Sequence, residues 1–311
     1  MKISLSIVIS TFCRPEILKD NLGIILESCK RYDIPIYISD DSLDLDTESM
    51  IQDLKANYSF ITFKRNIPRL GHDENLLHSL KLPNTDFVWL LGDSTLLNED
   101  AISKMIDFIS QNHYDIILMN ADAKAIDEPS KAYNNSNEIL AKFGWHATFT
   151  GATIYSKNAI KLIDKINFEN SKNFPQFKLI FSYLSINCSF YWVNEKLIGT
   201  RNSKIKSFWV ENTFSVFIDD WESVVFNLPE SYDQVNKKKV IIKHSKTTKV
   251  FGFKSLLSLR ILGIYNWKKY NEYEDSLSLH SNCSKTALIA IAIFPRIIIK
   301  VCHQILSKSN S

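Results

Sequence analysis

Four clusters of polar residues carry the side chains that could do chemistry in this sequence, and each follows a short apolar run. In chain order they contain Thr11 and Arg14, then Asp40 and Asp41, then Gly71 and Asn75, and finally Asp93. Backbone N–H groups at a helix start, together with an arginine, bind phosphate. Carboxylates accept hydrogen bonds and ligate hard cations. Whether the clusters act together depends on the elements that position them.

The first cluster is a polar turn, Ser10 to Pro15, that opens a predicted helix. Proline is suited to the first position of a helix, so the N–H groups of this turn and Arg14 could seat a phosphate. A polar residue in such a turn can equally be a simple helix cap. The motif alone leaves both interpretations open.

The carboxylates also allow a binding role and a local one. Asp40 could accept a hydrogen bond from a nucleobase or ribose, or it or Asp41 could cap the helix predicted from residue 44. Asp93 could hold a divalent cation that bridges a diphosphate, since Mg²⁺ commonly takes only one or two protein carboxylates. Its alternative is a turn aspartate bonded to its own backbone.

Short apolar runs alternate with helical patterns through the first 120 residues. Strands are predicted at Ser4–Ser10, Pro35–Ser39, Phe60–Lys64, Phe87–Leu91 and Ile116–Met119, and helices over about 15–32, 44–57, 73–81 and 98–112. This alternation predicts an α/β fold with a doubly wound, mostly parallel sheet, which binds ligands at the carboxyl ends of its strands. The four polar clusters should therefore meet at one edge of the sheet.

The second half of the sequence is less regular. Residues 120–147 are polar, with 134–137 as the loosest point, and an aromatic-rich, helical segment is expected over 205–228. The other elements expected there are a strand at Thr148–Tyr155, helices at 157–166 and from Pro175 to about Ile186, and a short strand at Phe190–Val193.

Charge divides the chain near residue 236. Residues 1–236 hold 23 lysines and arginines against 31 aspartates and glutamates, whereas residues 237–311 hold 14 against 3. A basic tail favours an anionic partner, either lipid or nucleic acid, and its aliphatic runs favour lipid. We predict a domain of residues 1–236, with halves 1–119 and 120–236, followed by a basic, amphipathic, membrane-associating helical extension, 237–311.

The sequence predicts no disulfide framework, zinc site or membrane-spanning segment. Its five cysteines are scattered and form no CxxC motif, which favours a reducing cytosol. The N-terminal apolar run is a poor signal peptide, and the most apolar stretch, Thr286–Pro295, is well short of the ~20 residues that span a bilayer. Trp267–Tyr270 and 285–308 are expected to dock on an anionic lipid surface, and the alternative is an ordinary C-terminal helix packed on the body.

Taken in order, the four clusters resemble the motifs of family 2 glycosyltransferases, which have the GT-A fold. The resemblance is clear over residues 3–110, fainter over 145–203, and strongest toward bacterial O-antigen and capsule enzymes of the abequosyltransferase-like group. The motifs that carry it are the T-x-x-R-P-like Thr11 to Pro15, the acidic second loop Ser39 to Ser42, the loosely spaced Asn66, Gly71 and Asn75, and the apolar strand ending in Gly92-Asp93.

The resemblance implies a role for each cluster. It implies that Thr11, Arg14 and Asp40 line a nucleotide pocket, with Asp40 toward the base. It implies that the other nucleotide-sugar-binding positions are Asp41, Gly71 and Asn75. Asp93 would belong to the acidic motif that holds Mg²⁺ or Mn²⁺.

The sequence departs from the family pattern in two places. The acidic run is reduced to Asp93-Ser94-Thr95, so metal affinity is expected to be weak. Gln176 stands where the family commonly has a carboxylate base, and glutamine cannot accept a proton at neutral pH. Gln176 is therefore expected to bind the acceptor, with His146 or Asp122 as general base, although a histidine beside Trp145 can also be simply packed.

The predicted activity is transfer of a hexosyl or deoxyhexosyl group from a nucleotide-sugar donor to a polyprenyl-diphosphate-linked surface polysaccharide, with inversion implied by the resemblance. The enzyme would be cytoplasmic and peripheral on the inner leaflet. The alternative is a catalytically degenerate scaffold that binds nucleotide sugar or glycan in an assembly complex, as Ser94 and Gln176 suggest. Nucleic acid is not an expected partner, because the basic residues are mixed with long aliphatic runs.

Overall fold

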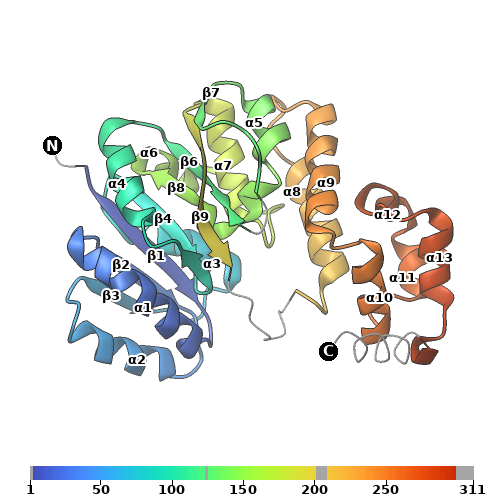
Figure 1. The fold of residues 1–311 in the computed structure, drawn as a ribbon, viewed down its shortest axis with the longest axis horizontal. Coiled ribbons are helices and arrows are strands. Elements are labelled where there is room, and N and C mark those ends of the chain that lie inside the picture. The colour runs from blue at the N-terminus through green and yellow to red at the C-terminus, as the bar shows by residue number, and fades with distance from the viewer. Residues whose placement is uncertain (1–2, 123–124, 201–208, 299–311) are drawn as a thin grey trace.

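The protein folds around a single nine-stranded sheet in the described part of the chain (Figure 1). The computed structural model describes residues 3–122, 125–200 and 209–298. The spatial order is β3-β2-β1-β4-β8-β6-β9-β5, with β7 pairing β9. The strands are β1 (Leu5–Thr11), β2 (Ile36–Asp40), β3 (Ile61–Arg65), β4 (Phe87–Gly92), β5 (Thr95–Leu97), β6 (Ile116–Ala121), β7 (Lys131–Tyr133), β8 (Thr153–Ser156) and β9 (Phe190–Thr200).

The sheet is parallel where the ligand-binding clusters lie and mixed beyond that. Strands β1 to β4 pair in parallel, as the alternation of strands and helices predicts. Strand β8 runs antiparallel to both β4 and β6, so β6 again runs in the direction of β4. The carboxyl ends of β1, β2, β4 and β6 therefore face the same edge.

The central strands are apolar throughout because both of their faces are covered. In β4, Val88 and Leu90 join one core while Trp89 and Leu91 join the other. Alternate residues of a strand point to opposite faces. An uninterrupted apolar run is therefore what a strand buried on both faces requires.

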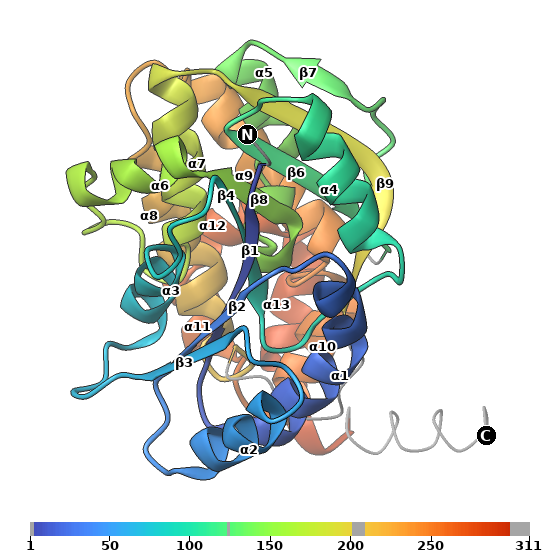
Figure 2. The same cartoon turned by 90° about the vertical axis from the view of Figure 1, so that its left-hand side faces the viewer.

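Helices cover the two faces of the sheet (Figure 2). Their side chains complete one core on each face. One core takes residues from α1 (Pro15–Arg31), α2 (Asp46–Lys55) and α4 (Ala101–Gln111), and the other from α3 (His72–Leu80), α5 (Ser136–Phe143), α6 (Lys157–Ile160) and α7 (Pro175–Ile186).

The C-terminal helices continue from the second core to a third one. Helices α8 (Trp221–Phe226) and α9 (Gln234–Thr248) pack on the second core. Beyond them lie α10 (Phe253–Leu262), α11 (Trp267–Glu272), α12 (Glu274–His280) and α13 (Lys285–Ile293), which share a core with the preceding π-helical turn η5 (Ser215–Asp220). Figure 1 shows this group at the end of the molecule opposite β3, with α8 and α9 between.

Part of the basic region is used inside the protein. The boundary drawn at residue 236 falls within α9, where Lys237 is 2% exposed and its Nζ donates to the carbonyl oxygens of Phe226 and Leu228. Burial lowers the pKa of Lys237. Among the residues that the structure describes, no helix is long and apolar enough to cross a membrane.

A buried histidine joins three of the C-terminal helices. The His280 ring of α12 lies between Ser245 Oγ of α9, 2.7 Å from Nδ1, and Glu222 Oε1 of α8, 2.9 Å from Nε2. The histidine side chain has no exposed surface. The buried hydrogen bonds of Ser245, His280 and Glu222 therefore join α12 to α8 and α9.

Several elements of the second half differ from the sequence expectations. The expected strand at Thr148–Tyr155 begins only at Thr153, because residues 146–152 form the two 3₁₀ turns η2 (His146–Thr148) and η3 (Thr150–Ala152). The supposedly loose 134–137 is a helix start, since Asn135 Oδ1 accepts the Glu138 N–H and caps α5. Of the segment expected to be helical over 205–228, residues 205–208 lie outside the described residues.

Replacing Gly144 should destabilise the protein by separating α5 from α9. A Cβ at this position would lie 2.5 Å from the Leu140 carbonyl oxygen and 2.6 Å from Val240 Cγ2. We expect Gly144→Ala to lower the free energy of unfolding by about 1–3 kcal/mol through overpacking, measured by denaturant titration. Gly23→Ala is the matched control, because a Cβ in the middle of α1 meets nothing within 4 Å. It should raise stability by ~0.5–1 kcal/mol, and equal losses in both variants would contradict the close contact.

Candidate functional site

The strand register places the predicted binding residues at one edge of the sheet. Thr11 at the end of β1 is the register partner of Asp40 at the end of β2, and Ser10 is the partner of Gly92, which precedes Asp93. Helix α1 begins directly after this turn, with Pro15 in its first position as predicted. The first, second and fourth clusters therefore meet at the N-terminal end of a helix.

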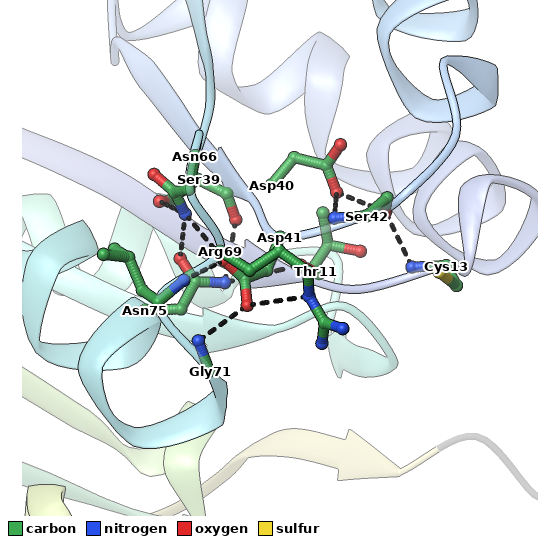
Figure 3. Close-up of polar contacts among 11 residues, drawn as sticks. Thr11, Cys13, Ser39, Asp40, Asp41, Ser42, Asn66, Arg69, Gly71 and Asn75 are labelled. Carbon is green, nitrogen blue, oxygen red and sulfur yellow. Dashed lines mark hydrogen bonds and ion pairs between the residues drawn. The ribbon is translucent and has the colours of Figure 1, made fainter.

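Asp40 presents a buried carboxylate oxygen that has no hydrogen-bond partner. The residue is 0% exposed, and its Oδ1 accepts the backbone N–H of Ser42 at 3.1 Å and the Ser42 hydroxyl at 2.5 Å. Its Oδ2 makes no hydrogen bond (Figure 3). Burial raises the pKa of Asp40, and the Ser42 hydrogen bonds oppose that shift. An unsatisfied buried acceptor is costly, so this oxygen suits an N–H or O–H of a ligand.

Asp41 is engaged by the protein itself. Its two oxygens accept the backbone N–H groups of Leu70 and Gly71, both at 2.8 Å, and Arg69 Nε lies 3.7 Å from Oδ2 (Figure 3). These contacts fix the loop that precedes α3. Neither Asp40 nor Asp41 caps α2, whose N-cap is Leu45 without a side-chain hydrogen bond, so the capping alternative is wrong.

The residues of the third cluster support this edge of the sheet by binding the ends of its strands. Asn75 Nδ2 donates to the carbonyl oxygens of Thr11 at 3.4 Å and Ser39 at 3.2 Å, which ties the ends of β1 and β2 together. Asn66 Nδ2 in turn donates to Asn75 Oδ1 at 3.1 Å. Gly71 has φ +85°, a conformation that favours glycine. These residues hold the loop against the strands.

Asp93 and Arg14 form a partly buried pair. Arg14 Nη1 lies 3.4 Å from Asp93 Oδ1, and the exposed fractions of the two side chains are 39% and 12%. Burial raises the pKa of Asp93, while Arg14 and Thr11 lower it. The side-chain amide of Asn21 also holds the Asp93 carbonyl oxygen at 3.2 Å. The pair brings one negative and one positive group to the edge where Asp40 lies.

The described residues fit a divalent cation only with help from a ligand. Within residues 3–122, 125–200 and 209–298, no group of three or more histidine, cysteine or acidic side chains is arranged to hold a metal. Asp93, with a hydroxyl next in sequence at Ser94, is a sparse donor set. Mg²⁺ sites of this kind are completed by substrate phosphate oxygens and water.

A cavity of about 470 Å³ begins beside Asp93 and extends toward the C-terminal helices. Both residues predicted to act on the acceptor, His146 and Gln176, line it. Its remaining lining residues are His72, Gly92, Ser94, Thr95, Ala121, Trp145, Thr148, Phe149, Thr150, Asn173, Phe174, Ile198, Trp209, Val216, Phe217, His244, Thr248 and Val250.

His146 and Gln176 are both buried in the cavity wall. His146 Nε2 lies 2.9 Å from the Met119 carbonyl oxygen, which fixes the N–H on Nε2 in the neutral ring and leaves Nδ1 a lone pair. Gln176 Nε2 donates to the Thr148 carbonyl at 3.1 Å, and its Oε1 is buried without a partner. Asp122, the other predicted base, is exposed after β6 and does not line the cavity.

Sequence reasoning missed the far wall of this cavity. Trp209, Phe217 and His244 come from the C-terminal part of the chain and face residues of the first 180. The aromatic density of 205–228 was the available signal for the first two. Nothing in the sequence spacing singles out His244, because α9 brings it to the wall through tertiary packing.

The sequence matches known proteins over its N-terminal part. Residues 6–178 match the model of the family described as Glycosyl transferase family 2. An abequosyltransferase of Salmonella typhimurium, RfbV, is 32% identical over 146 residues, which are 45% of this chain. The chain thus spans less than half of that relative, since the match covers 44% of its length.

Solved structures of similar fold cover nearly the whole chain. The Staphylococcus aureus protein TarS, residues 1–349, has a TM-score of 0.58 at 13% identity and covers 93% of this chain and 81% of its own. The mannosyltransferase PcManGT of Pyrobaculum calidifontis, in complex with GDP-Man and Mn²⁺, has a TM-score of 0.58 at 9% identity and covers 99% and 88%. The predicted GT-A architecture is confirmed by these likenesses.

Asp40→Asn should stabilise the free protein at neutral pH. Burial raises the Asp40 pKa, so the folded protein favours the neutral carboxyl. The stability that this neutral form contributes is fully present below the ordinary carboxyl pKa. It is lost as the pH rises through the pKa of Asp40 in the folded protein. Asparagine keeps the acceptor for Ser42 without the charge. We expect Tm to rise by about 2–4 °C at pH 7, roughly the effect of 1 kcal/mol, and the gain to vanish toward pH 4.

Asp86→Asn is the control of opposite sign. Hydrogen bonds from Ser4 lower the pKa of this exposed carboxyl, so its contribution to stability is present above the ordinary pKa and lost as pH falls. Its replacement should lower Tm slightly at pH 7 and not at pH 3. A fall in Tm for Asp40→Asn at pH 7 would contradict the desolvation of Asp40.

Proposed function

The chain belongs to glycosyl transferase family 2, and from this membership we propose that it moves a sugar from a nucleotide-sugar donor to a hydroxyl group of a growing surface glycan. The observation that carries the proposal is the edge where Asp40, Arg14 and Asp93 meet, next to a cavity large enough for a small molecule. Donor and acceptor would meet where Asp93 borders that cavity.

Asp40 and the turn after β1 are proposed to bind the nucleoside diphosphate. The free Oδ2 of Asp40 suits an N–H of the base or a hydroxyl of the ribose. Thr11, the backbone before α1 and Arg14 suit the phosphates, because the helix start carries partial positive charge. In this assignment Asp40 binds the nucleoside of the donor, and Arg14 binds its phosphates.

When the nucleoside diphosphate departs, negative charge develops on its phosphates next to Asp93, and this charge must be neutralised. Arg14 supplies one positive charge, and a Mg²⁺ or Mn²⁺ ion held by Asp93 and the phosphate oxygens would supply more. The mannosyltransferase of similar fold is described with GDP-Man and Mn²⁺. With a single carboxylate at the site, we propose that metal affinity depends strongly on bound donor.

The acceptor hydroxyl is proposed to be deprotonated by His146 and oriented by Gln176. His146 would take up the proton at Nδ1, because Nε2 carries the N–H that donates to the Met119 carbonyl oxygen. The free Oε1 of Gln176 can accept a hydrogen bond from a second hydroxyl of the acceptor. Attack by the deprotonated oxygen on the anomeric carbon opposite the leaving diphosphate inverts that centre, as the sequence resemblance implies.

The outer helices are proposed to hold the enzyme against an anionic membrane, where a polyprenyl-linked acceptor would be presented. Ile293, Phe294 and Ile297 are 60%, 47% and 77% exposed near Arg296, and Trp267 is 47% exposed beside Lys268. Apolar side chains rimmed by basic ones insert into lipid interfaces. Residues 299–308 of the predicted lipid-binding stretch lie outside the described residues. The location proposed is the cytoplasmic face of the inner membrane.

Asp93→Ala should reduce transfer strongly without abolishing nucleotide binding. Loss of the carboxylate that would hold the cation neutralising the departing diphosphate is expected to lower kcat by about 10²–10³-fold, measured as nucleotide release with Mn²⁺ and a panel of UDP-, GDP- and dTDP-sugars. Ser94→Asp adds a second carboxylate and should lower the Mn²⁺ concentration for half-maximal rate. Full activity of Asp93→Ala in EDTA would remove the metal role. Nucleotide binding without turnover on any lipid-linked acceptor would favour the scaffold alternative.

His146→Gln and Gln176→Leu should separate proton transfer from acceptor binding. Loss of the base is expected to lower kcat by about 10²-fold or more and to remove the acidic limb of its pH profile, because no imidazole that must be neutral to act would remain at this position. Gln176→Leu should raise the acceptor KM and keep that limb. An acidic limb that persists in His146→Gln would move the base to another residue, with Asp122 the next to test.

A further inference from the structure

We propose that the C-terminal part of the chain selects the acceptor by enclosing one uncharged sugar ring in an aromatic wall made of Trp209, Phe217 and His244. The inference rests on the proposed function and names the substrate class of the same cavity. These residues would make the C-terminal part of the chain, with His244 from the extension 237–311, a part of the substrate site, in addition to any role of the extension at a membrane.

The wall is a continuous row of rings in the lining of the cavity. His72 at the start of α3 meets Trp209 edge-on at 5.8 Å, and Trp209 lies 6.3 Å from Phe217. Phe217 in turn stacks on His244 of α9 at 5.9 Å with an interplanar angle of 24°. The row therefore links the donor half of the molecule to the C-terminal helices.

Two rings of the wall, those of Trp209 and Phe217, keep surface for a ligand, whereas His244 is 2% exposed and packs against Phe217. Trp209 and Phe217 are half-buried, whereas the neighbouring Trp221 and Phe177 are 0% exposed in the core behind them. Phe149, which also lines the cavity, is half-buried as well. Flat apolar faces in the lining of a cavity suit the C–H faces of a sugar ring, which bury apolar surface there.

The part of the lining that the structure describes carries polar groups but no permanently charged side chain. Among the described residues that line the cavity there is no aspartate, glutamate, lysine or arginine. Hydroxyl and amide groups of Thr148, Asn173 and Gln176 can exchange hydrogen bonds with sugar hydroxyls. Among the described lining residues a carboxylate would meet no lysine or arginine and only histidine rings, which pair with it only when protonated, so its loss of hydration would be poorly compensated. The cavity therefore suits a neutral sugar and disfavours a uronic acid.

The row of rings also explains why two parts of the chain meet here. The match to the family covers residues 6–178, which include the donor edge, His146 and Gln176. Trp209, Phe217 and His244 all lie beyond that segment. Donor chemistry and acceptor choice are thus assigned to different stretches of sequence, which share one cavity.

The test measures binding of simple glycosides to the full-length protein by saturation-transfer NMR. The probes are methyl α-mannoside, methyl α-rhamnoside and methyl α-galactoside as neutral rings, and methyl glucuronide as the acidic one, each with nucleoside diphosphate present. At least one neutral glycoside should give a signal and the glucuronide none. Trp209→Ala and Phe217→Ala should each lower the neutral signal at least fivefold.

Two controls separate wall effects from folding and from donor binding. Phe60→Ala removes a ring that is 52% exposed beyond the start of β3 and should keep the full signal, and Trp209→Phe should restore much of it. Thermal stabilisation by UDP, GDP and dTDP is measured in the same samples. Nucleotide binding by the wild type with no glycoside signal, or with an equal glucuronide signal, overturns the wall proposal alone. Absence of stabilisation by every nucleotide would instead count against the proposed function.

Discussion

The parallel register of β1, β2 and β4 is the constraint on which the rest of the site depends. It brings Thr11, Asp40 and Asp93 to one edge although they are far apart in sequence. Two of these residues are buried carboxylates whose pKa is raised by desolvation. Such groups are costly in a free protein, and they make sense at a place where a ligand supplies the missing donors and positive charge.

Much of the polar structure around this edge exists to keep it in shape. Asp41 clamps the loop before α3 through two backbone N–H groups, and Asn75 ties the ends of β1 and β2 together. Adjacent aspartates thus have different tasks: Asp41 is satisfied within the protein, and Asp40 keeps one oxygen free. The contrast follows from their surroundings, because their chemistry is identical.

The C-terminal helices pack on the body of the molecule and contribute to the cavity. Helix α9 packs on the second core and carries His244 to the cavity, while the Ser245–His280–Glu222 chain holds α8, α9 and α12 together. The buried Lys237 side chain donates hydrogen bonds to carbonyl oxygens at the end of α8. A region whose composition indicates lipid binding therefore also has a structural role near the site.

Local patterns were enough to predict the α/β alternation, the helix start at Pro15, the family and the order of the polar clusters, because strand periodicity and helix caps depend on residues close together in the chain. The sequence could not determine that residues 146–152 form 3₁₀ turns, that Asn135 caps α5, or that Asp41 and Asn75 support the loop. It also did not place His244 in the lining of the cavity that contains His146. Those outcomes depend on contacts between residues distant in the chain, and only tertiary packing decides which side chains are satisfied internally and which remain free for a ligand.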